Sequence, residues 1–289
     1  MLRQRWLIVG LLAAVVLGGG WILARNDMDE KTVLFDIGLT PEATAKKTRL
    51  PLSGQNTDGY IDFGFAGFPD GVYAKLDKPG YEIKVGPLFA INFYADTKVR
   101  GVSHAVTFGL NLDHITTPEQ AYDYVYGLIA QFQRGKWKRY IPEKCPRLQG
   151  KSSLLDQQEI KAMSDPELKN FMGLGCPVDP AYKPDFEEWK RFVTSEGPTY
   201  LWRDGAGKIA RLDLTLSDTG DAKFGMGDFR IDLEFELEEV MLANEKRNLE
   251  DDLKKPWGAR VAKVEIEKRR IRDLLEAMAL KREEQLAER

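Results

Sequence analysis

The segment Phe229–Leu237 has the sequence FRIDLEFEL and alternates an apolar residue with a charged one at every step. Successive side chains of a β-strand point to opposite faces of the sheet. The apolar residues of the segment therefore share one face. The charged residues on the other face are Arg230, Asp232, Glu234 and Glu236. This pattern predicts an antiparallel strand that is buried on one side and faces water on the other.

Two further strands are predicted just before this segment. The runs Tyr200–Arg203 and Ile209–Leu216 flank the sequence DGAG at 204–207. Aspartate and glycine are residues that tight turns favour, so the two runs predict a hairpin. Together with Phe229–Leu237 they indicate a block of antiparallel strands over residues 198–238.

An earlier block, residues 59–141, combines similar strands with a helix. Its strand candidates are separated by turn residues and are Tyr60–Phe65, Val72–Leu76, Leu88–Tyr94, Val102–Leu112 and, after the helix, Lys136–Ile141. For the helix, Thr117 is a favourable N-cap, Pro118 suits the first turn, and Gln120 completes a capping box. Apolar residues then recur at the helical period, and Gly135 ends the helix. The fold expected is α+β, with antiparallel β-meanders and packed helices.

Residues 142–197, between the two blocks, contain both cysteines and many prolines. We expect a disulfide between Cys145 and Cys176, because an isolated pair in an oxidising compartment bonds most simply to itself. Two buried free thiols are the alternative. A bridge over a loop of about 32 residues would stabilise the fold by roughly 3–4 kcal/mol. Because both blocks place strands before a helix, two related β-then-α halves are also left open.

The C-terminal segment, residues 239–289, is expected to form charged helices divided at Pro256. Residues 238–289 hold 26 charged side chains, thirteen of each sign. In the second helix a short seam at alternating spacings of three and four residues consists of Val261, Val264, Lys268, Ile271, Leu275 and Met278. The seam fits a helix that packs on its own domain. A homo-oligomeric or partner coiled coil through residues 261–278 is the alternative.

A hydrophobic segment near the N-terminus, Trp6–Ala24, holds nineteen consecutive residues without a charge. As a helix it would be roughly 28 Å long, close to the ~30 Å hydrocarbon core of a bilayer. Arginines precede the segment and acidic residues follow it, which predicts a cytoplasmic N-terminus at residues 1–5. The expectation is a single transmembrane signal anchor in the lipid bilayer at residues 6–24, with cleavage at the glycine run as the alternative.

This topology places the chain at the inner (plasma) membrane as a single-pass protein, with the bulk of the chain exported to the periplasm. Residues 25–58 are then a tether between the anchor and the exported domain, with one short strand at Val33–Ile37. The cysteine pair agrees with an oxidising compartment.

We identify no catalytic, cofactor-binding or metal-binding constellation in the sequence. The formal net charge of −3 gives no electrostatic reason to expect nucleic acid. His104 and His114 have no cysteine or histidine at metal-ligand spacing, so we expect surface or satisfied core histidines. Paired carboxylates for hydrolysis are left open, because 45 acidic residues offer many pairs.

Four aromatic residues are candidates for partner binding: Tyr122, Tyr126, Trp137 and Tyr140. Exposed tyrosine and tryptophan are typical anchors of protein interfaces. The alternative is that these side chains pack on the neighbouring sheet.

The function expected is a non-enzymatic, membrane-anchored protein-binding module. Its most concrete form is an immunity protein that neutralises a toxin delivered to the envelope. The first alternative is an envelope scaffold or secretion-system subunit that assembles through its C-terminal helix. The second alternative is a cryptic carboxylate-dependent hydrolase.

Overall fold

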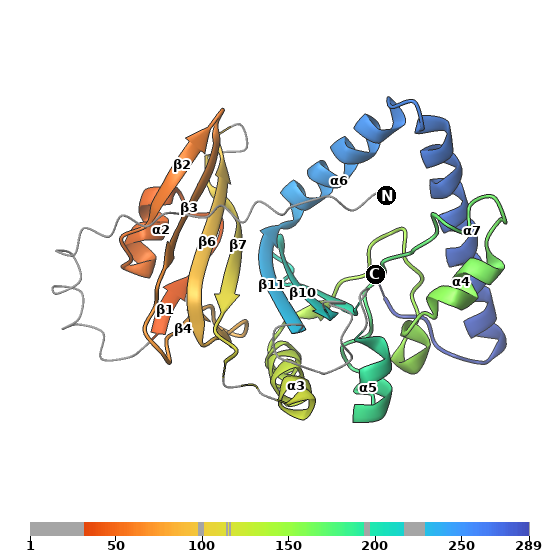
Figure 1. Cartoon of the computed structure of the whole chain (residues 1–289), viewed down its shortest axis with the longest axis horizontal. Helices are drawn as coiled ribbons and strands as arrows, with labels where there is room; N and C mark the ends of the chain where they lie inside the picture. The colour runs from red at the N-terminus through yellow and green to blue at the C-terminus, as the bar shows by residue number, and fades with distance from the viewer. Residues whose placement is uncertain are drawn as a thin grey trace.

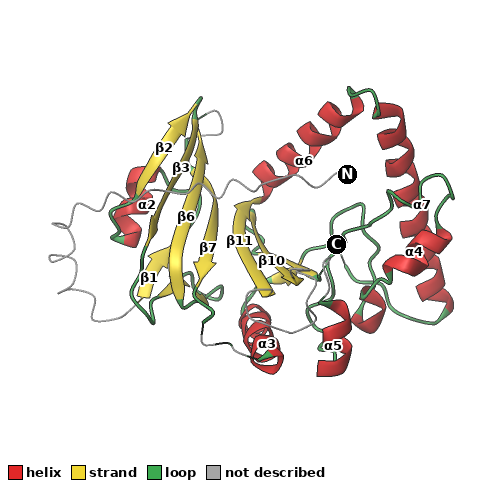
Figure 2. Cartoon of the chain, viewed as in Figure 1, coloured by secondary structure: helices red, strands yellow, loops and turns green. Residues whose placement is uncertain are grey.

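The computed structural model describes residues 32–97, 101–113, 115, 117–193, 197–216 and 229–288. The fold is α+β, with one large antiparallel sheet and several helices (Figures 1 and 2). The large sheet has eight strands in the order β2-β3-β6-β7-β11-β10-β9-β8. Its strands are β2 (Ser53–Thr57), β3 (Tyr60–Ala66), β6 (Leu88–Asp96), β7 (Ser103–Leu110), β8 (Lys138–Arg139), β9 (Thr199–Arg203), β10 (Lys208–Leu216) and β11 (Phe229–Leu237).

A smaller sheet has the order β1-β4-β5, and its strands are β1 (Thr32–Phe35), β4 (Tyr73–Leu76) and β5 (Ile83–Val85). The described helices are α2 (Pro41–Thr48), α3 (Pro118–Arg134), α4 (Gln157–Met163), α5 (Phe186–Phe192), α6 (Glu238–Leu253) and α7 (Gly258–Lys281), with a 3₁₀ turn at Gly150–Ser153. Residues 32–57 thus belong to two strands and a helix, where the sequence predicted a tether. The reason lies in β1 and the turn after it, because Val33, Phe35 and Ile37 are buried in the core.

Strand β11 has the bounds and the one-sided burial that its alternation predicts. Ile231, Leu233 and Phe235 are at most 4% exposed. Because β11 pairs with β7 on one side and β10 on the other, it joins the strands of the two predicted blocks into one sheet. The blocks at 59–141 and 198–238 therefore share a single core.

Helix α3 begins with the predicted capping box. The Thr117 side chain accepts a hydrogen bond from the Gln120 backbone N–H at 3.3 Å, and the Gln120 side chain accepts one from the Thr117 N–H at 3.2 Å. The apolar face of the helix packs on the core face of the sheet, where the Phe132 ring stacks on Trp202 with centroids 4.1 Å apart. Burying a side chain of this size stabilises the fold by about 1.5–3 kcal/mol.

The predicted disulfide is present, and it lies in a region that packs on the C-terminal helix. Cys145 and Cys176 are bonded, with Cα atoms 5.5 Å apart. A second apolar cluster joins residues of α4 and the following loop to Ile271, Leu275 and Ala279 of α7. The seam of α7 is therefore largely engaged within its own chain, and a coiled coil through residues 261–278 would have to displace these contacts.

The predicted membrane anchor at residues 6–24 lies outside the described residues. Across the described ranges, no helix is both long enough and apolar enough to cross a bilayer, and the longest one, α7, is rich in charged residues. The fold prediction is corrected on this point, since no helix among the described residues supports an N-terminal signal anchor. The single-pass inner-membrane location, with a cytoplasmic N-terminus and a periplasmic domain, is withdrawn for the same reason.

Candidate binding surface on the polar face of the sheet

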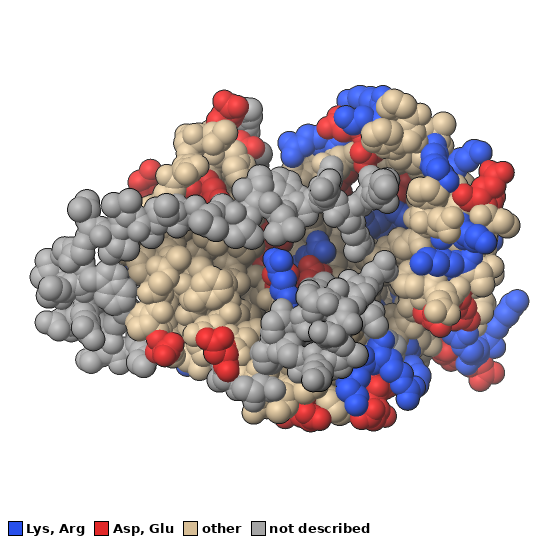
Figure 3. Space-filling view, in the orientation of Figure 1, with Lys and Arg blue, Asp and Glu red and all other residues tan. Residues whose placement is uncertain are grey.

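The face of the large sheet opposite the apolar core carries charged, hydroxyl and aromatic side chains from five strands. We call it the polar face and define it by Tyr60, Asp62, Tyr94, His104, Thr107, Arg211, Asp213, Arg230, Asp232, Glu234 and Glu236. Figure 3 shows basic and acidic side chains in a hollow near the centre of the molecule. The alternation of side chains along each strand puts the apolar core on one side and this set on the other.

The strand register brings these side chains into neighbouring rows. Glu234 of β11 lies opposite Thr107 of β7 on one side and Arg211 of β10 on the other. Asp62 of β3 lies opposite Tyr94 of β6. Residues directly opposite one another in antiparallel strands share a face, with Cβ atoms about 4.5–5.5 Å apart. Segments more than a hundred residues apart in the chain therefore meet on one surface.

Both arginines of the polar face pair with an aspartate two positions along their own strand. Arg211 Nε lies 2.5 Å from Asp213 Oδ2, and Arg230 Nε lies 2.8 Å from Asp232 Oδ1. The two glutamates of β11 form no ion pair in the part of the chain that the structure describes, although Arg211 attracts both through space. The positive charge of the face is thus already committed to its aspartates.

The pKa values of the acids reflect this imbalance. Burial, and then the charge of Glu234, raises the pKa of Glu236 to about 7, while Arg211 and a hydrogen bond with Asn244 of α6 act in the opposite direction. Burial also raises the pKa of Glu234 and of Asp62. Loss of hydration disfavours the charged form of a carboxyl group unless a cation replaces the water. The polar face therefore holds acidic groups with too little compensating charge.

Aromatic rings adjoin the acids. The Tyr60 ring lies between those of Tyr94 and His104, with centroid distances of 6.1 and 6.2 Å. Burial raises the pKa of the Tyr60 and Tyr94 hydroxyls, so both are neutral phenols at neutral pH. The Tyr94 hydroxyl lies 3.5 Å from that of Thr107. Tyr60 is 42% exposed, so its ring is open to a partner.

His104 is buried like a core histidine, but one of its ring nitrogens is not hydrogen-bonded in the structure described. The side chain is 7% exposed, as expected for a core histidine, but its Nδ1 has no hydrogen-bond partner in the structure described. Burial lowers the pKa of His104, so the ring is neutral at neutral pH. His114 lies outside the described residues.

No metal centre is formed by the described residues. They contain no group of three or more histidine, cysteine, aspartate or glutamate side chains placed to hold a metal ion.

Three of the four aromatic residues predicted to anchor a partner are buried, and the fourth, Tyr122, is partly exposed. Tyr126, Trp137 and Tyr140 are at most 9% exposed. Tyr122 is partly buried and its hydroxyl donates a hydrogen bond to the backbone carbonyl of Pro184 at 2.8 Å. Helix α3 directs Tyr122 towards Phe186 and Trp189 of α5, and it directs Tyr126 towards Tyr200 of the sheet.

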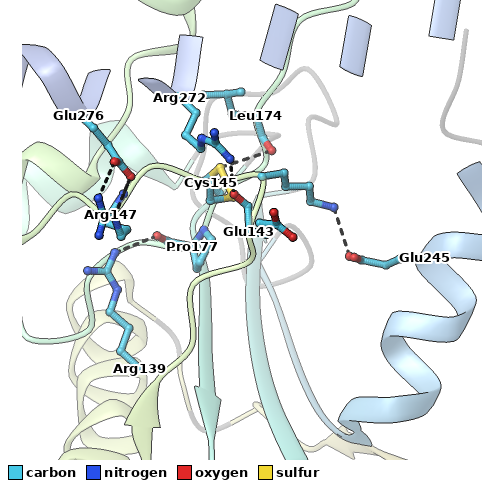
Figure 4. Close-up of a disulfide and its surroundings, with 11 residues drawn as sticks. Arg139, Glu143, Cys145, Arg147, Leu174, Pro177, Glu245, Arg272 and Glu276 are labelled. Carbon is cyan, nitrogen blue, oxygen red and sulfur yellow. Dashed lines mark hydrogen bonds and ion pairs between the residues drawn. A yellow bond between two sulfur atoms is a disulfide. The ribbon is translucent and has the colours of Figure 1, made fainter. Parts of the chain in front are cut away.

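A separate cleft of about 620 Å³ lies between the loop that holds Cys145 and helix α7. Its charges are largely satisfied within the chain (Figure 4). Arg147 binds both carboxylate oxygens of Glu276, at 3.1 and 2.9 Å. Arg272 donates to the backbone carbonyl of Glu143 at 2.9 Å. These contacts hold α7 against the disulfide loop, and they leave less charge for a ligand than the polar face does.

The sequence pattern located only part of the polar face. The alternation in β11 placed Glu234 and Glu236 opposite the core but implied ordinary surface acids. It did not show that Asp62 and Tyr94 would lie on the same face of the same sheet, or that the two glutamates would be half-buried. The alternation of side chains in their own strands does place Asp62 and Tyr94 opposite the buried residues. That information locates the site only once the order of the strands in the sheet is known.

No family model, no curated protein and no solved structure matches the chain.

Proposed function

We propose that the protein is a non-enzymatic protein-binding module whose polar face receives a lysine- or arginine-bearing segment of a partner. The observation that carries this proposal is the pair Glu234 and Glu236, two half-buried carboxylates on one face without an ion pair in the described part of the chain. A cation placed between them would replace the hydration that the fold has removed. Hydrogen bonds to charged groups of this kind contribute about 1.5–3 kcal/mol each.

The surroundings of the pair favour a protein side chain over a small inorganic ion. The described residues do not provide a metal-binding group, whereas the ring of Tyr60 is exposed on the same face and its hydroxyl lies within electrostatic reach of both glutamates. A guanidinium or ammonium group over an aromatic face gains about 0.5–1 kcal/mol at an exposed site. Guanidinium also forms two parallel hydrogen bonds with one carboxylate, which an inorganic ion does not.

The immunity-protein form of this function stays a prediction. The polar face would suit a toxin with a basic active site or basic surface, and binding there would block it. Assembly as a scaffold through the C-terminal helix receives less support, since Ile271 and Leu275 of that helix pack within the chain.

One observation favours the carboxylate hydrolase as a second candidate. A carboxyl group with a pKa of about 7, such as Glu236, is suited to act as a general acid near neutral pH. Glu234 lies two residues away on the same face, so the Cα atoms are roughly 6.6–6.8 Å apart.

The test of the proposed function is titration calorimetry with a lysine-rich peptide that lacks apolar residues. We expect the Glu234→Gln/Glu236→Gln variant to bind at least about tenfold more weakly than wild type. The matched control is Glu119→Gln/Asp123→Asn, which removes two exposed acids from α3, and it should change binding less than about twofold. Equal losses in the two variants would show that only net charge matters and would refute the proposal. Turnover of a glycoside panel that the glutamine variant abolishes would instead support the hydrolase.

A further inference from the structure

Exposed apolar side chains gather on the two C-terminal helices. Of the eleven large apolar side chains that are exposed in the described ranges, seven lie between Leu242 and Leu280. Single exposed apolar residues are ordinary on a protein surface, whereas a concentration of them indicates an interaction site.

On α6 three of these side chains share one face of the helix, with Glu245 and Lys246 between the first and the second. Leu249 follows Leu242 by seven residues and Leu253 follows Leu249 by four, so at about 100° per residue the three point in nearly the same direction. Trp257, in the turn between α6 and α7, is also exposed. The exposed fractions are 46% for Leu242, 38% for Leu249, 43% for Leu253 and 45% for Trp257. We call these four residues the leucine stripe.

The leucine stripe is not what attaches α6 to the rest of the protein. Val240 is the buried residue of this helix, and Met241 packs against Tyr140, Leu201 and Ile209. Both lie in the first turn of α6. Beyond that turn the helix rises away from β11 until it meets α7 (Figure 1). Most of the stripe therefore lies on the part of α6 that extends beyond its attachment to the sheet.

The charged residues beside the leucine stripe are mainly acidic, which favours a partner with basic residues. Helix α6 has six acidic residues and two basic ones. Asp252 lies along one edge of the stripe together with Glu245, which also pairs with Lys144 at 3.2 Å. Glu250 lies along the other edge beside Lys246. A second copy of α6 would bring like charges together at these edges, and an anionic membrane surface would be repelled. A helix with lysine or arginine beside its apolar residues fits both features.

We propose that α6 is a docking arm for an amphipathic helix of a partner, one whose apolar stripe is bordered by basic residues. The partner lays its apolar side chains against Leu242, Leu249 and Leu253, and its basic side chains meet the acids at the edges of the stripe. Recognition of helices through anchors spaced by three, four and seven residues is a recurrent mode of peptide binding. The first turns of α6 reach the polar face, where Asn244 is hydrogen-bonded to Glu236, but the side chains of the stripe are not part of that face. The stripe variant and the Glu234→Gln/Glu236→Gln variant therefore test the two proposals separately.

The experiment uses the full chain and two synthetic helical peptides of about 18 residues, roughly 27 Å long as helices. Both peptides have leucine at every third or fourth position, and the other positions are lysine in one and glutamate in the other. We expect the lysine peptide to bind at least about tenfold more tightly than the glutamate peptide. The Leu249→Ser/Leu253→Ser variant should lose that binding by at least about tenfold, while the Glu234→Gln/Glu236→Gln variant keeps it.

The matched control is Ile266→Ser, which removes an exposed apolar side chain from α7 and should change binding less than about twofold. Circular dichroism checks that the variants remain folded, since all three replaced side chains are exposed. Equal binding of the lysine peptide to wild type and the stripe variant would overturn the inference. So would tight binding of the glutamate peptide, self-association that the stripe variant abolishes, or stripe-dependent binding to anionic lipid vesicles.

Discussion

Glu234 raises the pKa of Glu236, two residues further along the same face of β11, and burial raises it more strongly. Together these effects bring the pKa of Glu236 to about 7, against an ordinary value of 4.5. A fold that maximised its own stability would have placed a cation between these acids. The described residues do not, and this is why we regard the polar face as a surface for a partner.

The pair gives the stability of the protein a defined pH dependence. Because the folded-state pKa of Glu236 lies above its unfolded value, its contribution to stability is fully present below pH 4.5 and is lost as the pH rises through about 7. We expect Glu236→Gln to raise the free energy of unfolding by about 1 kcal/mol more at pH 8 than at pH 5. The difference is smaller than the full pKa shift implies, because water screens part of the charge. Urea unfolding at both pH values measures this. An identical effect of the substitution at pH 5 and pH 8 would contradict the account.

The stacked pair Phe132 and Trp202 should dominate the main core. Replacing Phe132 with alanine removes a fully buried ring and should cost about 3–5 kcal/mol of unfolding free energy. Phe89→Ala is the control, because that side chain is 52% exposed and its loss should cost less than about 1 kcal/mol. Chemical denaturation compares the two, and similar losses would mean that the core is elsewhere.

The disulfide should stabilise the region that packs on α7. With a sequence separation of 31 between Cys145 and Cys176, the Cys145→Ser/Cys176→Ser variant should lose about 3–4 kcal/mol. Wild type treated with a thiol reductant should show the same loss. Unfolding curves that coincide with and without the bridge would contradict this.

The capping box of α3 offers a smaller effect that is specific to one side chain. Thr117→Ala removes the acceptor for the Gln120 N–H and should lower the free energy of unfolding by about 0.5–2 kcal/mol. Thr117→Ser keeps a hydroxyl acceptor and should retain most of the stability of wild type. Thermal unfolding of the three proteins gives the order. If serine is as damaging as alanine, the hydroxyl is not the stabilising group.

Local patterns in the sequence predicted individual elements well. The strict alternation of Phe229–Leu237 defined β11, and Thr117 with Gln120 defined the start of α3, because both signals depend on near neighbours in the chain. The pairing of β11 with β7 was not predictable in this way. It depends on contacts between residues more than a hundred positions apart, which no local pattern encodes.

The same limit explains the failures at the candidate site. Tyr126 and Trp137 have the composition of interface anchors, but burial depends on which element packs over them, and that was unknown. The hydrophobic segment Trp6–Ala24 predicted an anchor by composition alone, and no described helix supports a membrane span. Glu234 and Glu236 were correctly placed away from the core, yet their loss of hydration depends on strands far along the chain.

The most direct measurement is the side-chain pKa of Glu236, followed by carbon-detected NMR with and without a saturating lysine-rich peptide. The account predicts a pKa near 7 in the free protein and a clear fall towards 4.5 in the complex, since a bound cation stabilises the charged carboxylate. A pKa that stays near 7 when the peptide is bound would place the partner elsewhere and contradict the central claim.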